Sequence, residues 1–131
     1  MTVSNHQKIM AVDDEADILQ IIKRYLEKWG FAVDTFTNPL DALEQFKKDP
    51  DLYSVILLDV RMPEISGIAL AELMLKVKPE ARIVIMTAYE LRTEDLKFSL
   101  PTISYNDILQ KPFRLVQICN AVKKQLQRTT Q

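Results

Sequence analysis

Short apolar runs alternate with longer amphipathic segments along most of the chain, and this alternation limits the possible folds more than any other feature. The short runs lie at positions 9–12, 31–36, 55–58, 83–86 and 108–109. Apolar residues also recur at spacings of three and four, the pattern of amphipathic helices, around positions 18–29, 39–46, 70–77 and 115–126. The sequence therefore predicts strands that alternate with helices.

Such alternation indicates repeated βαβ units and a mostly parallel sheet with helices on both faces. Right-handed crossovers leave few topologies for five such units. We expect an α/β fold, a flavodoxin-like (βα)5 doubly wound parallel five-stranded sheet with strand order 2-1-3-4-5. The 131 residues fit one domain, expected over residues 1–131 with its core at about 8–128. The fourth helix is the weakest element, because its periodicity fades over 91–105 and Pro101 interrupts it.

Residues that start and stop helices flank these segments. Asn38 is a good helix cap and Pro39 a good first helical residue. Gly30 is expected to end the first helix and Pro79 to close the third. The buried stripe of the second helix is predicted to consist of Leu40, Leu43 and Phe46.

Composition and charge argue for a soluble, cytoplasmic domain. The chain has 17 basic and 18 acidic residues, so its net charge gives no reason to expect nucleic acid or a membrane surface as a partner. No apolar run approaches the roughly 18 residues that a membrane span needs, and the polar N-terminus lacks the apolar segment of a secretory signal. Cys119 is the single cysteine and is expected to be a buried apolar residue. His6 is expected to be solvated.

Polar side chains follow four of the five predicted strands at the point where each strand ends. Asp13 and Asp14 follow the first strand, Asp59 the third, Thr87 the fourth and Lys111 the fifth. Ligands of open α/β sheets bind outside the carboxyl ends of the strands. We therefore expect these five side chains to meet at one edge of the sheet.

Three carboxylates at one edge need a cation or a proton, because one like-charge pair at 4 Å costs roughly 4 kcal/mol at an effective dielectric of 20. Oxygen ligands without His or Cys favour Mg²⁺ over Zn²⁺. Mg²⁺ prefers one or two carboxylates together with a phosphate oxygen, which suits a phosphoryl donor. Asp59 stands alone and is the candidate nucleophile for an aspartyl phosphate. Lys111 is then suited to bind the transferred group, and Thr87 to donate a hydrogen bond to it.

At these positions the chain resembles the receiver domain of two-component response regulators. The matching segments are 12–15 (VDDE), 57–67 (LLDVRMPEISG), 85–88 (IMTA) and 111–113 (KPF), and the resemblance covers about residues 8–128. It implies a phosphorelay switch that accepts a phosphoryl group from a sensor histidine kinase or a phosphotransfer protein. The only chemistry that it implies is phosphorylation and dephosphorylation of the chain itself.

The resemblance also implies a role for each site residue. Asp59 matches the phosphoacceptor, Asp14 a direct Mg²⁺ ligand and Asp13 a ligand that acts largely through water. Arg61 matches the residue that lends its backbone carbonyl to the metal. Thr87 matches the switch hydroxyl and Lys111 the phosphate-pairing lysine, and the peptide bond from Lys111 to Pro112 is often cis in this family.

Two departures from the family pattern concern the output side of the domain. The position three residues before the lysine, usually aromatic, is Ile108, and Tyr105 lies three residues earlier. The usual Gly-Ala before the fifth strand is also absent. In this family the face formed by helix 4, strand 5 and helix 5 commonly carries the output signal. We expect the chain to be a monomer, or a weak dimer that associates through this face. The downstream partner is not identified by the sequence.

Other interpretations stay open. The chain is alternatively a receiver-like adaptor that binds partners constitutively, without phosphorylation. A Mg²⁺-dependent phosphatase with an aspartyl nucleophile is disfavoured, because Arg61 stands where such enzymes generally have a second acid. Tyr89, two residues after Thr87, either overhangs the phosphoryl group and slows attack by water or belongs to the output face. Only a few residues follow the last helix, so the protein either acts alone through binding or is part of a longer one.

Overall fold

The computed structural model of the chain describes residues 8–104 and 107–127. Within them, five strands form one parallel sheet in the order β2-β1-β3-β4-β5. This confirms the predicted fold class and strand order. The strands are β1 (Lys8–Val12), β2 (Ala32–Phe36), β3 (Tyr53–Asp59), β4 (Ile83–Thr87) and β5 (Ile108–Gln110).

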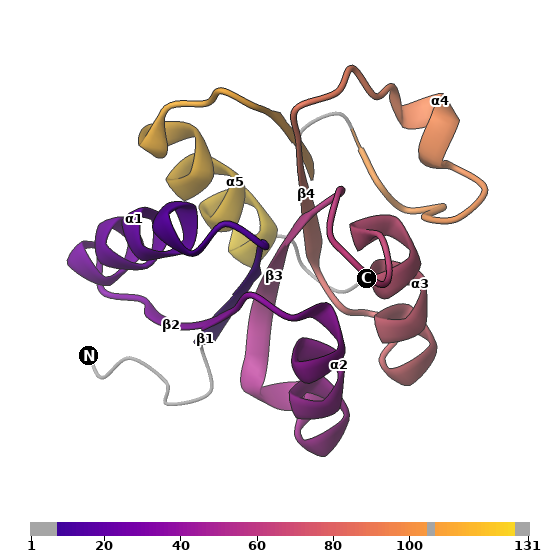
Figure 1. Cartoon of the computed structure of the whole chain (residues 1–131), viewed down its shortest axis with the longest axis horizontal. Helices are drawn as coiled ribbons and strands as arrows, with labels where there is room; N and C mark the ends of the chain where they lie inside the picture. Colours follow the sequence, from indigo (N-terminus) through magenta and orange to yellow (C-terminus); the bar gives the residue numbers. More distant parts are fainter. Residues whose placement is uncertain (1–7, 105–106, 128–131) are drawn as a thin grey trace.

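Helices cover both faces of the sheet, with α1 and α5 on one side and α2 and α3 on the other (Figure 1). Two apolar cores result, one beneath each pair of helices, and the central strand β3 contributes alternate residues to both. The helices are α1 (Ala16–Lys28), α2 (Pro39–Lys48), α3 (Gly67–Val77), α4 (Thr93–Leu96) and α5 (Leu115–Gln127), with a short 3-10 turn η1 (Pro50–Leu52).

The helix boundaries follow the local signals in the sequence. The side chain of Asn38 accepts a hydrogen bond from the backbone of Leu40 at 2.8 Å, and Pro39 is the first residue of α2. Gly30 has a φ of 94° just beyond the end of α1, and its N–H donates to the carbonyl of Glu27. These predictions are confirmed, and Cys119 is buried within α5, as expected.

The predicted buried stripe of α2 is wrong at Leu40, since this residue is 43% exposed. The inward face is instead formed by Pro39, Ala42, Leu43 and Phe46. At 100° per residue, Leu40 is rotated by roughly a quarter turn or more from the centre of that face. Trp29 is the last residue of the apolar pattern predicted over 18–29, and it is exposed as well. It caps the end of α1 and does not extend the buried stripe of that helix.

The segment after β4 departs from a regular helix, as the sequence predicted. The helix α4 has four residues and stands apart from the other helices (Figure 1). Three buried side chains hold the segment to the body of the protein, while Phe98 between them is 97% exposed; the three are Leu96, Leu100 and Ile103. Ile108 lies in β5 opposite Ile85, and Tyr105 and His6 lie outside the described residues.

No helix in the described part of the chain is long and apolar enough to span a membrane.

Candidate functional site

The predicted site residues lie at the carboxyl edge of the sheet. Asp59 and Thr87 are the last residues of β3 and β4, and Asp13 and Lys111 directly follow β1 and β5. The sheet thus brings together residues separated by up to 98 positions in the sequence.

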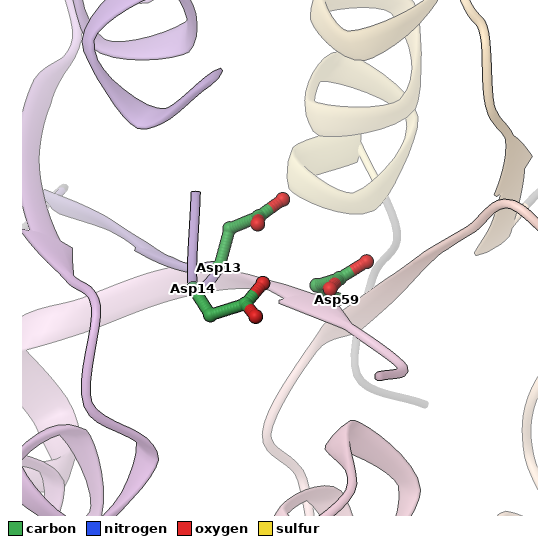
Figure 2. A group of neighbouring side chains, drawn as sticks. All are labelled: Asp13, Asp14 and Asp59. Carbon is green, nitrogen blue, oxygen red and sulfur yellow. The ribbon is translucent and has the colours of Figure 1, made fainter. Parts of the chain in front are cut away.

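Three carboxylates form the centre of this edge (Figure 2). One oxygen each from Asp13, Asp14 and Asp59 lies within 4.8 Å of the others. Asp13 is completely buried and Asp59 is 6% exposed, whereas Asp14 is exposed. The buried Asp13 is held by its neighbours, since its side chain accepts a hydrogen bond from the backbone of Glu15 at 2.9 Å. The trio therefore offers fixed inner ligands and one outer ligand that solvent can reach.

Lys111 joins two of these carboxylates. Its Nζ lies 2.9 Å from Oδ2 of Asp13 and 3.1 Å from Oδ1 of Asp59. Its backbone N–H donates to the carbonyl of Thr87 at 2.6 Å, so the ends of β4 and β5 are tied at the site. The peptide bond between Lys111 and Pro112 is cis, as the resemblance implied.

The electrostatics of the site favour a further cation. Burial raises the pKa of Asp59; the hydrogen bond from Lys111 opposes this rise, and the charges of Asp13 and Asp14 add to it. Burial acts to lower the pKa of Lys111, but its contacts with Asp13 and Asp59 outweigh this and raise it. Lys111 therefore stays protonated, and its single positive charge leaves three carboxylates only partly neutralised.

The donor set fits Mg²⁺. All three candidate side-chain ligands are carboxylates, which are hard oxygen donors, and Asp14 faces an open pocket of about 250 Å³. The pocket is also lined by Asp59, Thr87 and Lys111. Such a pocket leaves room for the waters and the phosphate oxygen that complete a magnesium shell.

Comparison with known proteins decides the family. A sequence model of the response regulator receiver domain matches residues 9–123. The chain belongs to the response regulator receiver domain family. As a receiver domain it is a phosphoacceptor switch of two-component signalling, the class of domain that histidine kinases or phosphotransfer proteins phosphorylate.

Relatives of two kinds resemble this receiver domain. The response regulator receiver protein CpdR of Brucella abortus is 29% identical over 120 residues, which cover 92% of this chain and 97% of CpdR. The transcriptional regulatory protein CreB of Escherichia coli is 32% identical over 93% of this chain but only 52% of its own length. The chain thus spans nearly all of CpdR and about half of CreB.

Solved structures of receiver domain proteins also resemble this chain. The response regulator TrrA of Thermotoga maritima, in complex with Mg²⁺ and BeF, matches with a TM-score of 0.77 and 31% identity over 91% of this chain and 98% of its own. A receiver domain protein of Clostridium thermocellum matches with a TM-score of 0.80 and 26% identity over 92% and 94% of the two chains.

In this receiver domain the hydroxyl of Thr87 is turned toward the loop after β4. It accepts a hydrogen bond from the N–H of Tyr89 at 2.9 Å and donates one to the carbonyl of Tyr89 at 3.2 Å. Tyr89 lines the pocket together with Asp59 and Lys111. This position favours the interpretation that places Tyr89 over the site rather than on the output face.

One contact at the pocket was not predicted from the sequence. The guanidinium of Arg61 donates a hydrogen bond to the hydroxyl of Tyr89 and lies 4.9 Å from the centroid of its ring. A signal was present, since each residue stands two positions after a site residue on adjacent strands. Such neighbouring positions allow a contact, but only the loop conformations decide whether it forms.

Proposed function

We propose that the chain accepts a phosphoryl group on Asp59 in a Mg²⁺-dependent reaction and thereby changes its binding to a protein partner. The observation that carries this proposal is the position of the Asp59 carboxylate, which lies 3.1 Å from the Lys111 ammonium and within 4.8 Å of the Asp13 and Asp14 ligand atoms. We assign Asp59 as the nucleophile, Lys111 as the cation that pairs with the phosphoryl group, and the three carboxylates as the side-chain metal ligands.

In the proposed transfer, a carboxylate oxygen of Asp59 forms a bond to phosphorus, and the bond from phosphorus to the donor breaks. Asp13, Asp14, Asp59 and the backbone carbonyl of Arg61 would hold Mg²⁺. When bound, Mg²⁺ neutralises negative charge that develops on the transferred group. Asp14 is the one exposed carboxylate of the three, and buried Asp13 fixes the inner wall of the site.

In the proposed switch, Lys111 and Thr87 respond to the negative charge of the phosphoryl group on Asp59. Lys111 binds a phosphoryl oxygen from its place beside Asp59, and its contact with Asp13 holds it there. Thr87 turns its hydroxyl from Tyr89 to the phosphoryl group. One to three new charge-assisted hydrogen bonds, each worth roughly 1.5–3 kcal/mol, bias the loop after β4. A swing from 1:99 to 99:1 needs about 5.5 kcal/mol, so we expect a partial population shift unless a partner adds binding energy.

The donors we propose are a sensor histidine kinase or a phosphotransfer protein, and the site of action is the cytoplasm. The output surface is proposed to be the face of α4, β5 and α5; Phe98, two residues beyond the end of α4, is 97% exposed. We propose that the chain is a monomer, or a weak dimer that associates through this face. Sedimentation of the parent and of Phe98→Ser tests this, and a dimer that Phe98→Ser leaves unchanged would place the interface elsewhere.

Incubation with acetyl phosphate and Mg²⁺, followed by mass spectrometry, tests the phosphorylation directly. We expect an adduct of about 80 Da, one phosphoryl group, on the parent and on the control Asp41→Ala, which lacks an exposed acid of α2. The adduct should be absent from Asp59→Ala and from samples with EDTA. An adduct that persists in Asp59→Ala would overturn the assignment. Partner binding that survives Asp59→Ala unchanged would instead support the constitutive adaptor.

A further inference from the structure

Arg61 and Tyr89 connect the loops that follow β3 and β4 across the wall of the pocket. The guanidinium of Arg61 both donates to the phenol oxygen of Tyr89 and lies 4.9 Å from its ring centroid. Both residues line the pocket that contains Asp59, and Tyr89 is 48% exposed. Two contacts of different kinds therefore hold one aromatic ring in place.

The backbone of the same tyrosine holds the hydroxyl of Thr87. The N–H of Tyr89 donates to Oγ1 of Thr87, and Oγ1 donates to the carbonyl of Tyr89. A threonine hydroxyl has a single proton to donate. Thr87 cannot donate to a phosphoryl oxygen until it has released the carbonyl of Tyr89.

We propose that Arg61 and Tyr89 form a clamp that keeps the Thr87 hydroxyl turned away from Asp59 in the resting protein. Arg61 fixes the ring of Tyr89, the fixed residue presents its backbone groups to Thr87, and Thr87 stays in the resting orientation. Both are positioning residues, and the clamp sets how much binding energy the phosphoryl group must supply to turn Thr87. This inference rests on the proposed function, because it takes Thr87 as the hydroxyl that responds to Asp59.

The expected effect is modest. A cation–π contact at an exposed site changes an equilibrium by about two- to fivefold. Loss of the clamp should therefore open the loop about two to five times more often. It should also lower, by the same factor, the concentration of a phosphoryl mimic needed for half-saturation, since a resting state that is easier to leave opposes binding less.

Two measurements on the full 131-residue chain report whether the clamp is formed. The first is the hydrogen exchange rate of the main-chain amide at position 89, measured by NMR without Mg²⁺ or phosphoryl donor, because this amide donates to Thr87. The second is the half-saturation concentration of beryllofluoride in excess Mg²⁺. The variants are Arg61→Met, which removes both contacts, Tyr89→Phe, which removes the hydrogen bond and keeps the ring, and the double variant. Arg114→Met removes an exposed positive charge elsewhere and is the matched control.

We expect faster amide exchange and a lower beryllofluoride midpoint in Arg61→Met, and smaller changes of the same sign in Tyr89→Phe. Arg114→Met should match the parent. The double variant should not exceed Arg61→Met, because contacting residues do not act independently.

Unchanged amide exchange in Arg61→Met overturns the clamp, and so do fully additive effects in the double variant. A higher beryllofluoride midpoint in Arg61→Met also overturns it, because it would mean that Arg61 acts through its charge alone. A parent protein that takes up neither beryllofluoride nor phosphoryl would overturn the proposed function instead. The amide exchange still tests the clamp in that case.

Discussion

Gly67 lies so close to Asp59 that a Cβ at position 67 would fall 2.0 Å from the main-chain carbonyl oxygen of Asp59. The N–H of Gly67 donates to the carbonyl of Val60 at 2.8 Å, and the N–H of Val60 donates to the carbonyl of Met86 at 3.0 Å. The first residue of α3 is thus folded back against the end of β3. The backbone that carries Asp59 is held from both sides by this arrangement.

We predict that Gly67→Ala destabilises the protein and impairs the site, because the atom that would be overlapped is backbone and cannot rotate away. The expected loss in the free energy of unfolding is about 1–3 kcal/mol or more. Urea unfolding and the acetyl phosphate reaction measure the two effects. Gly30→Ala is the control: Gly30 has a φ of 94° and no atom within 4 Å of an added Cβ. Backbone strain should lower its free energy of unfolding by only about 1–2 kcal/mol, and phosphorylation should stay complete. Equal effects at both positions would contradict the contact.

Asp59 should oppose folding when it is ionised and no divalent cation is present. Burial raises the pKa of Asp59 above its ordinary value of 3.8. Its protonation therefore contributes stability that is fully present below pH 3.8 and is lost as the pH rises through the higher pKa of the folded state. Asp59→Asn should then raise the free energy of unfolding near neutral pH by about 1 kcal/mol, and the gain should shrink toward pH 3.8.

Urea unfolding in EDTA across this pH range measures the gain, with Asp41→Asn, an exposed acid of α2, as the control that should show none. A gain that grows as the pH falls would contradict the sign of the pKa shift. Destabilisation by Asp59→Asn at neutral pH would show that the contact with Lys111 outweighs burial.

Mg²⁺ should stabilise the folded protein through the carboxylate trio. A ligand that binds only the folded state at 100 times its dissociation constant adds about 2.7 kcal/mol. Asp14→Ala should lose most of this gain, whereas Asp17→Ala, an exposed acid in the first turn of α1, should keep it. Thermal unfolding in magnesium chloride, against sodium chloride of equal ionic strength, separates binding from screening. Equal losses in both variants would point to a diffuse charge effect.

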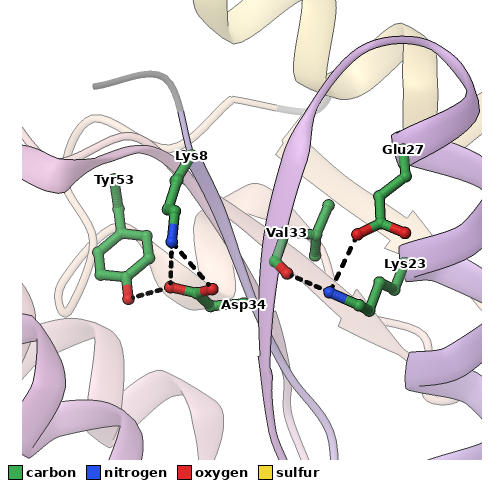
Figure 3. Close-up of polar contacts among 6 residues, drawn as sticks. All are labelled: Lys8, Lys23, Glu27, Val33, Asp34 and Tyr53. Atoms are coloured by element: carbon green, nitrogen blue, oxygen red, sulfur yellow. Dashed lines mark hydrogen bonds and ion pairs between the residues drawn. The ribbon is translucent and has the colours of Figure 1, made fainter. Parts of the chain in front are cut away.

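A polar cluster at the opposite end of the sheet gives a prediction about alkaline stability (Figure 3). Asp34 of β2 accepts a hydrogen bond from the Tyr53 hydroxyl at 2.7 Å, and Lys8 of β1 lies 3.3 Å from the same carboxylate. Burial raises the pKa of Tyr53 well above its ordinary 10.0, and the contact with Asp34 raises it further. The neutral hydroxyl is therefore the form that the folded protein keeps.

Tyr53→Phe should lower the free energy of unfolding near neutral pH by about 1 kcal/mol, the value of one hydrogen bond. The contribution of Tyr53 is fully present below pH 10.0 and is lost as the pH rises toward the pKa of the folded state. The difference between parent and variant should therefore narrow above this pH. Urea unfolding on both sides of it is the test, with Tyr25→Phe on α1 as the control. A difference that widens in alkali would contradict the prediction.

The edge strand β2 shows a contact that sequence patterns do not reveal. Lys23 of α1 donates to the backbone carbonyl of Val33 at 2.7 Å and is held by Glu27 at 3.0 Å (Figure 3). A lysine that occupies an edge carbonyl reduces pairing with other chains. The spacing of Lys23 and Glu27 favours their own ion pair in any helix, but the bond to Val33 depends on how α1 packs against β2.

The sequence by itself determined the alternation of strands and helices, the parallel sheet order and the edge at which the site residues meet. These follow from local periodicity and from the rule that parallel strands end at the same edge. The cap at Asn38 and the stop at Gly30 were equally local, since each depends on a few consecutive backbone groups.

Only the tertiary structure decided how side chains from different loops meet. The contacts of Lys111 with Asp13 and Asp59 and the stacking of Arg61 on Tyr89 join segments that lie far apart in the chain. The turn of Thr87 toward Tyr89 is local, but it depends on the conformation of the loop after β4. The exposure of Leu40 was misjudged for a related reason. Periodicity indicates that a helix has an apolar face, but the packing of that helix on its neighbours determines which of its residues are covered.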